Sequence, residues 1–216
     1  MYTPEEYRAP DPSWTAELVA GNPLALLCSN AGATPHATHL PAIVLGDADA
    51  VEPGVVLAGH LNRANPHWSA LRTGDEALLV FTGPHGYVSP TVYDNDPAAP
   101  TWDFTAVHVR GVLRVVEDSR GTIDVIRATV RALESRFGCD WDMSGSHGYF
   151  NELLPGVGAF EVEVTGVQSM FKLSQEQPDE LRRRVRRCFA ASTAGQHRQL
   201  AELIGRVPAA ERAATP

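Results

Sequence analysis

The residues from Phe104 to Asp118 alternate between apolar and polar side chains over a long run, FTAVHVRGVLRVVED. Alternation with a period of two is typical of a strand that buries one of its faces. We expect a long strand here that bends near Gly111, because a glycine inside a strand often marks a bend. It is the fifth of seven strands that the sequence predicts.

The other six segments with strand character make the chain mainly β. Their residue ranges are 24–30, 36–45, 54–61, 76–83, 158–167 and 169–174. Seven strands with long connections and peripheral helices favour a closed or partly open antiparallel barrel. The predicted fold class is therefore mainly β with peripheral helices (α+β).

Three segments before residue 175 carry helix signals. Asp11 and Pro12 supply an N-cap and a first-turn proline for a short helix that ends at Gly21. Between Thr122 and Phe137 the apolar residues recur at helical spacing, which predicts the clearest helix of the chain. The sequence SHGYFNELLPG adds one or two helical turns.

After Pro178 the sequence is helical to its end, and we divide the chain into a barrel domain, residues 1–175, and a helical extension packed on it, residues 176–216. The extension carries one basic run, made of Arg182, Arg183, Arg184, Arg186 and Arg187. An arginine-rich helix beside acidic residues is more typical of a solvated or intersubunit face than of a nucleic-acid site. The net charge of −8 also argues against a protein that coats nucleic acid.

Composition narrows the class of protein further. No apolar run approaches the eighteen or so residues of a membrane span, and the first residues lack the apolar core of a signal peptide, so a cytoplasmic protein is expected. Cys28, Cys139 and Cys188 form no paired motif, which predicts reduced thiols. Of 18 basic residues only Lys172 is a lysine, which suggests that its ammonium matters; chance survival at an exposed site is the alternative.

The region from Gly59 to Arg110 concentrates imidazole and aromatic groups among Gly, Pro and Asn. Such a composition on strand ends and turns is typical of a rigid pocket with a few placed polar groups. His60 ends an apolar strand and is followed by Arg63, Asn65, His67 and Trp68. A histidine at such a position can ligate iron or form a hydrogen bond with the edge of a ligand's ring. Arg and Asn commonly bind phosphate or carboxylate groups. The alternative is a histidine satisfied by backbone groups, and the spacing does not decide between His60 and His67.

Two further groups of residues are open to two interpretations. Tyr87 and Ser89, beside His85 and Tyr93, would share a face in an extended segment and bind a polar ligand, or they would close a hairpin. His108 and Arg110 share a face of the long strand and could meet an anion, or they could pair across strands at the solvent. Trp102 is a candidate pocket wall.

Four ordered motifs in residues 1–175 resemble one known family. GHLNRANPHW, GPHGYVSPTVY, PTWDFTAVHVRG and FKLSQ are similar to the motifs of the PaiB-type split barrels, often labelled FMN-binding transcriptional regulators. The run VHVRGVLRVVED is also similar to a strand of the pyridoxamine-phosphate oxidase-like split barrels. This resemblance implies a split β-barrel and a homodimer with the cofactor between subunits.

A closer resemblance is to the haem-dependent piperazate synthases, which share this fold. It runs through NPLALLCSN, HATHLPAIV, HLNRANPHWSAL, APTWDFTAVHVRG, ALESRFG, LPGVGAF and MFKLSQEQ. The chain also departs from ordinary flavin members in a short loop between Tyr93 and Pro100, and in Val92, where they commonly carry Trp. The resemblance implies haem b as cofactor and side-chain N-hydroxylated L-ornithine as the small-molecule substrate, cyclised to piperazic acid by N–N bond formation with loss of water.

The resemblance also implies roles for residues. His60 is the expected axial ligand of the iron, with His67 as the second choice. The residues expected to contact the cofactor are His60, Arg63, Asn65, His67, Trp68, Trp102, His108 and Arg110. Those expected to act on the substrate are His60, Lys172, Tyr87 and Ser89. A flavin-binding oxidoreductase or regulator with FMN is the alternative, in which Arg63, Asn65 and Lys172 would hold the flavin phosphate.

Overall fold

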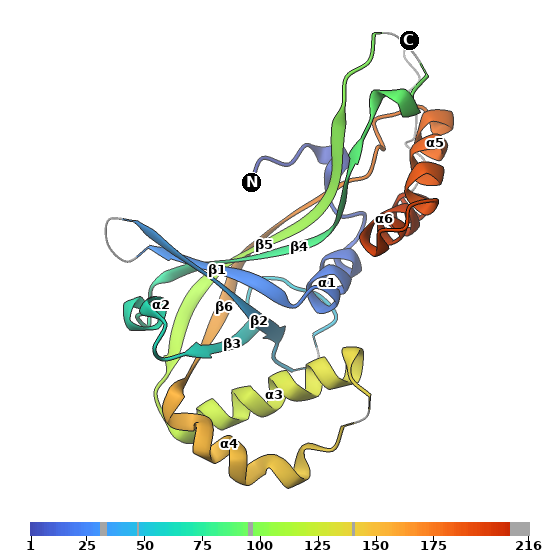
Figure 1. Ribbon diagram of the computed structural model, residues 1–216. Helices are drawn as coiled ribbons and strands as arrows, with labels where there is room; N and C mark the ends of the chain where they lie inside the picture. Colours follow the sequence, from blue (N-terminus) through green and yellow to red (C-terminus); the bar gives the residue numbers. More distant parts are fainter. Residues whose placement is uncertain (31–33, 47, 95–96, 140, 208–216) are drawn as a thin grey trace. The chain divides into compact units, whose positions relative to one another are not determined.

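The computed structural model describes residues 1–30, 34–46, 48–94, 97–139 and 141–207 (Figure 1). The loop between Tyr93 and Pro100 therefore lies partly outside the described residues. The α-helices are α1 Pro12–Gly21, α2 Pro66–Ala70, α3 Ser119–Phe137, α4 His147–Leu153, α5 Asp179–Ala190 and α6 Gly195–Arg206. Short 3-10 helices are η1 Glu5–Tyr7, η2 Pro90–Val92, η3 Met143–Ser146 and η4 Leu154–Gly156. No helix in these ranges is long and apolar enough to cross a membrane.

Six strands form a closed barrel in the order β1-β2-β3-β6-β5-β4. Their bounds are β1 Leu24–Asn30, β2 Pro35–Val44, β3 Val56–Asn62, β4 Glu76–Val88, β5 Thr101–Val116 and β6 Val157–Lys172. β1 pairs antiparallel with β2 and β4, and β3 pairs antiparallel with β2 and β6. The predicted fold class, mainly β with peripheral helices, is confirmed.

The prediction of seven strands was wrong, because residues 158–167 and 169–172 belong to the single strand β6, which ends before residues 173 and 174. Four successive residues from Gly166 to Ser169 are half-buried, so the alternation disappears there although the strand continues. Strand β4 also runs through the segment rich in Gly and Pro that was open to interpretation as a turn. There the Pro84 carbonyl accepts a hydrogen bond from the Thr105 hydroxyl, one of the contacts by which pairing overrides local propensity.

The chain divides into two compact units. Unit 1 comprises Met1–Trp14, Thr82–Ala106 and Gln168–Pro216, and unit 2 comprises Thr15–Phe81 and Val107–Val167. Strands β4, β5 and β6 contribute residues to both units. The division between residues 175 and 176 made from the sequence remains a prediction.

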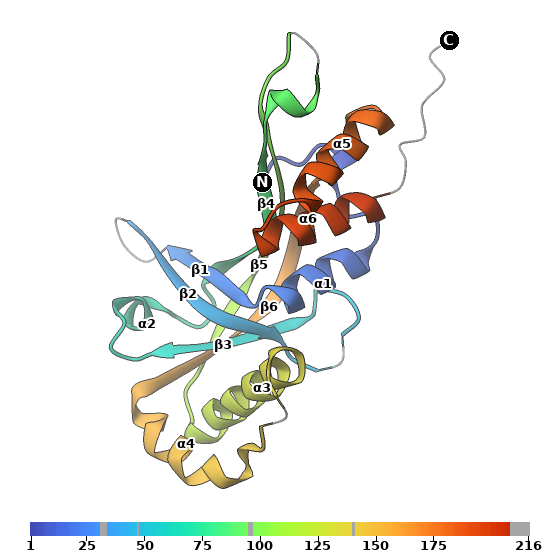
Figure 2. The ribbon, with the colours of Figure 1, turned by 45° about the vertical axis from the view of Figure 1, so that its right-hand side comes forward.

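In unit 2 the barrel is packed on both sides of the β3–β6 pair. Gly59 of β3 lies opposite Phe160 of β6, and a Cβ built on Gly59 would be only 2.8 Å from the Phe160 ring. On the other face Ala58 and Ala159 cluster with Val125 of α3. The amphipathic helix α3 thus covers the outer face here, and α4 lies next to α3 in both views (Figures 1 and 2).

Unit 1 has its own packing. The Trp14 ring meets Phe171 of β6 edge-on, with centroids 5.4 Å apart, and the Arg206 guanidinium lies 4.5 Å from the Trp14 ring. Helices α5 and α6 pack together, with the rings of Phe189 and His197 at 5.2 Å. These contacts fix both C-terminal helices within unit 1.

The close approach of β5 to β6 explains the glycine in the long strand. A Cβ built on Gly111 would lie 2.3 Å from the backbone oxygen of Glu163. We expect Gly111→Ala to force the two strands apart and to lower the free energy of unfolding by about 1–3 kcal/mol. Gly166→Ala is the matched control, since a Cβ there meets nothing within 4 Å. Urea titrations of the two variants check this; equal stability would contradict it.

Candidate functional site

His60 is a half-buried histidine on the outer face of β3, in unit 2. It lies opposite Ala159 of β6, and the neighbouring pair on the same face is Ala58 with Glu161. The His60 Nδ1 atom is buried and has no hydrogen-bond partner in the part of the chain that the structure describes. Burial lowers the pKa of His60 below its usual value, so its imidazole is neutral at neutral pH. A neutral imidazole with an unbonded ring nitrogen is the form that ligates metals.

The same face extends across β6 to β5. Arg114 of β5 forms an ion pair with Glu161, which places Arg114 on this face. Arg110 and His108 precede Arg114 at even intervals along the strand and therefore share its face. We call this surface, made of His60, Glu161, Arg114, Arg110 and His108, the His60 face. Three residues that the sequence singled out, His60, His108 and Arg110, therefore lie on the same face of the sheet.

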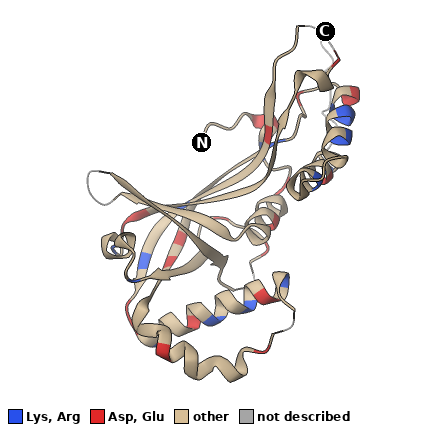
Figure 3. Cartoon of the chain, in the orientation of Figure 1, with Lys and Arg blue, Asp and Glu red and all other residues tan. Residues whose placement is uncertain are grey.

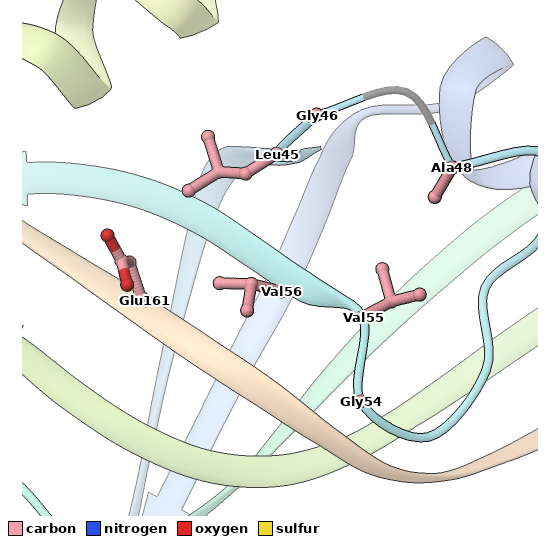
Figure 4. Close-up of a pocket in the computed structure, with 7 residues that line it drawn as sticks. All are labelled: Leu45, Gly46, Ala48, Gly54, Val55, Val56 and Glu161. Carbon is pink, nitrogen blue, oxygen red and sulfur yellow. The ribbon is translucent and has the colours of Figure 1, made fainter.

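An apolar hollow opens beside this face within unit 2. Its volume is about 440 Å³, and it is lined by Leu45, Gly46, Ala48, Gly54, Val55, Val56 and Glu161 (Figure 4). Among the described residues that line it, only Glu161 is charged. Val56 precedes His60 on β3 by an even interval, so both side chains point to the same face of the sheet. Sequence reasoning missed the hollow, whose lining carries no distinctive residue types.

The polar residues that follow β3 build structure. The Asn65 side chain caps α2 by accepting from the His67 backbone N–H at 2.9 Å. Arg63 donates through Nε to the Val157 carbonyl at 2.8 Å, and its guanidinium lies 5.0 Å from the Trp68 ring. The Trp68 ring in turn occupies the space beside Gly158, where a Cβ would lie 2.5 Å away. The Asn65 cap holds α2 in place. Arg63 is exposed, so the terminal nitrogens of its guanidinium can still reach an anionic ligand.

His67 is buried, with only 2% of its surface exposed. Its Nε2 lies 2.9 Å from the Ser29 hydroxyl and its Nδ1 lies 2.9 Å from the Thr38 hydroxyl. The ring also stacks on His36 at 5.1 Å. With both ring nitrogens bonded, His67 has none left for a ligand in this arrangement, which favours His60 over it.

The remaining residues singled out by the sequence lie in unit 1. Trp102 is 48% exposed, and its ring centroid lies 6.1 Å from Tyr87 and 5.8 Å from His85. These three form an exposed aromatic group on β4 and β5. Ser89 instead caps η2, accepting from the Thr91 N–H at 3.3 Å.

Lys172, the single lysine, ends β6 in unit 1. Its ammonium donates to the Thr101 hydroxyl and lies 6.0 Å from the Tyr7 ring. Lys172 is half-buried and therefore does not lie at an exposed site, whereas the functional importance of its ammonium remains a prediction.

Sequence reasoning missed a buried polar cluster next to Lys172. Asp103 is fully buried, and its Oδ2 accepts from the Ser174 hydroxyl at 2.6 Å. Burial raises the pKa of Asp103 to about 6, with Glu176 adding to the effect against the opposing hydrogen bond from Ser174. Tyr93 is also buried, and its hydroxyl has no hydrogen-bond partner within the described ranges. The sequence did contain one indication of this cluster. Asp103 occupies a core-facing position of an alternating strand, where burying a carboxylate costs free energy.

The arginine-rich helix α5 mixes opposite charges, as Figure 3 shows. Arg183, Arg184 and Arg187 all form ion pairs with Glu180, and Arg182 pairs with Asp179. Arg184 also pairs with Asp94. These pairs offset the positive charge of α5, and the absence of a nucleic-acid partner remains a prediction.

Comparisons with known proteins agree with this architecture. The family described as the Putative FMN-binding domain matches residues 1–166. The protease synthase and sporulation protein PAI 2 of Bacillus subtilis is 26% identical over 178 residues, which are 82% of this chain and 83% of that protein.

Two solved structures share the fold. A conserved hypothetical protein of Mycobacterium tuberculosis matches with a TM-score of 0.56 and 13% identity, over 82% of this chain and 94% of that one. The FAD and haem binding protein of Mycobacterium smegmatis matches with a TM-score of 0.54 and 15% identity, over 77% of this chain and 73% of that one.

A closed six-stranded barrel with peripheral helices, a fold shared with these solved structures, is therefore the structural class of this protein. Within that class, the chain belongs to the family described as the Putative FMN-binding domain. The PAI 2 protein is a relative of this chain.

The bonding of His67 predicts a pH dependence of stability. Burial, and then the neighbouring His36, hold the pKa of His67 below its usual value of 6.5. Because the unfolded chain takes up this proton more readily, His67 stabilises the fold fully above pH 6.5 and progressively less below it. We expect the stability difference between the wild-type protein and His67→Gln to shrink from pH 7.5 to 5.5, by at most about 1.4 kcal/mol per pH unit.

Urea titrations at the two pH values measure this difference. The raised pKa of Asp103 makes the fold more stable as the pH falls, which is opposite to the effect of His67. Both proteins contain Asp103, so its contribution cancels in the difference between them. A difference that stays constant or grows at pH 5.5 would contradict the role given to neutral His67.

Proposed function

We propose that the protein is a haem-dependent cyclase that converts side-chain N-hydroxylated L-ornithine to L-piperazic acid. In this reaction an N–N bond forms between the α-amine and the side-chain nitrogen, the N–O bond breaks, and water leaves without net oxidation or reduction. The observation that carries the proposal is His60, a half-buried neutral imidazole with an unbonded ring nitrogen.

The residues around His60 suit haem b as the cofactor. Its macrocycle is flat and apolar, and the apolar hollow points to the same face of the sheet as His60. Its propionates need cations, which Arg110 on this face and the free end of Arg63 could supply. A solved protein of the same fold is described as binding FAD and haem, so the fold can accommodate a macrocycle. When bound, haem iron would supply a Lewis acid that takes the hydroxylamine and weakens its N–O bond.

The chain itself would hold and orient the substrate. Lys172 is proposed to bind a carboxylate or supply a proton, and the aromatic group of Tyr87 and Trp102 to form a wall. Orientation matters because ring closure needs the two nitrogens in contact, and a fixed geometry can remove much of the barrier. Asn65, His67, Trp68 and Ser89 would act by keeping these elements in place, while His108 would line the cofactor face. We further propose that the protein is a homodimer in the cytoplasm.

The second candidate is a flavin-binding oxidoreductase or regulator with FMN. The specific observation in its favour is the family match over residues 1–166. Arg63, Asn65 and Lys172 would then serve the flavin phosphate.

The absorption spectrum of protein from cells supplied with iron and a haem precursor separates the two candidates. A Soret band that shifts with hydroxylated ornithine, together with piperazic acid detected by mass spectrometry, would support the cyclase. Flavin absorption without a Soret band would support the second candidate and end the first.

The axial role of His60 is tested by substitution. We expect His60→Ala to lose most of its Soret absorbance, because strand β3 holds no second histidine that could replace it. His39→Ala, at an exposed histidine on β2, is the matched control and should keep the wild-type spectrum. A wild-type spectrum in His60→Ala would rule out His60 as the ligand.

A further inference from the structure

The polar cluster of unit 1 contains a buried carboxylate that the protein satisfies only in part. Asp103 Oδ2 is bonded to the Ser174 hydroxyl, but Oδ1 is buried and has no partner among the described residues. A buried carboxylate oxygen without a partner costs a substantial free energy, so a partner from outside the chain would be favourable.

A second unsatisfied group belongs to the same cluster. The Tyr93 hydroxyl is buried and has no partner among the described residues, and Tyr93 itself is only 7% exposed. Burial raises the pKa of Tyr93, and the charge of Asp103 adds to this effect. The Tyr93 backbone is held in place, because Arg184 donates to the Tyr93 carbonyl at 3.4 Å. Asp103 and Tyr93 thus each present a buried oxygen that has no partner in the described part of unit 1.

The charges of the cluster are unbalanced toward the negative. The charge of Glu176 raises the pKa of Asp103, and the ammonium of Lys172 opposes this effect. The Lys172 ammonium is bonded to Thr101 and forms no ion pair with a carboxylate in the described residues. Burial and these carboxylates also raise the pKa of Tyr7 to about 12. A cluster of this kind would be stabilised by a bound ammonium group.

Backbone strain marks the cluster as a built feature. Ser174 adopts φ +57°, a left-handed conformation that side chains other than glycine rarely take. Its hydroxyl is what bonds Asp103 in this conformation. Strain of this sort persists where surrounding structure enforces it and is common at ligand sites.

We propose that Asp103, Tyr93 and Lys172 form a subsite for the zwitterionic head of an α-amino acid. Asp103 Oδ1 and the Tyr93 hydroxyl accept hydrogen bonds from the α-ammonium, and Lys172 donates to the α-carboxylate. The two charged groups of such a head are joined through a single carbon, and the subsite offers a cation and an anion within one cluster. The identity of the amino acid, an ornithine derivative, rests on the proposed function; the chemistry of the subsite depends on no cofactor.

The experiment is isothermal titration calorimetry of the protein as purified, with L-ornithine as the probe. We expect binding to weaken at least about tenfold in Asp103→Asn and in Tyr93→Phe, since each loses a hydrogen bond to a charged group. Tyr93→Phe removes a hydroxyl that has no hydrogen-bond partner in the described residues, so this variant should fold normally. Asp124→Asn, which removes an exposed carboxylate from α3, is the matched control and should bind like the wild-type protein.

Two analogues assign the groups. Nα-Acetyl-L-ornithine lacks the α-ammonium and should bind weakly, with no further loss in Asp103→Asn. Putrescine lacks the carboxylate, so its binding should be insensitive to Lys172→Met. Wild-type affinity of Asp103→Asn and Tyr93→Phe for L-ornithine, or no binding of L-ornithine to the wild-type protein at millimolar concentration, would overturn the subsite.

These outcomes are independent of the proposed cyclase. Binding of L-ornithine that depends on Asp103, in a protein with no Soret band and no piperazic acid formation, would retain the subsite and reject the cyclase. If the protein binds haem and forms piperazic acid while Asp103→Asn keeps wild-type affinity for L-ornithine, the cyclase is retained and the subsite is rejected.

Discussion

The pairing of β3 with β6 is the contact on which the arrangement of unit 2 depends. Gly59 has no side chain, so the Phe160 ring can occupy the barrel interior directly opposite it. Because neighbouring residues of a strand point to opposite faces, this inward placement of residue 59 directs the next side chain, His60, outward. A larger residue at position 59 would displace Phe160 and shift the register that sets His60 beside Ala159. The position of the candidate ligand thus follows from packing inside the barrel.

Periodicity was a good guide to the strands because each buries one face, and the sequence records that face directly. It failed from Gly166 to Ser169, where four residues are half-buried while hydrogen bonding to neighbouring strands continues. The glycines and prolines at the end of β4 were open to interpretation as a turn for a similar reason: propensity is local, whereas strand pairing is decided by a partner elsewhere in the chain. Long-range pairing is the part of the fold that one sequence records least.

The candidate site was predictable in composition but not in assignment. His60 could be chosen from its place at a strand end, yet only the structure reveals that His67 is bonded to Ser29 and Thr38, distant in sequence. Asn65 and Ser89 were grouped with ligand-binding residues and are found capping helices. The Asp103–Ser174 bond joins residues 71 positions apart, and no spacing rule could have found it.

Ser174 combines a conformation that favours glycine with a hydroxyl that glycine lacks. Replacement by glycine would relieve the backbone but remove the hydroxyl that donates to Asp103. Selection for stability and selection for the carboxylate therefore act in opposite directions at this one position. Serine persists only while the carboxylate is needed, so chains of this fold that have lost that need are free to drift to glycine at 174 and to an apolar residue at 103.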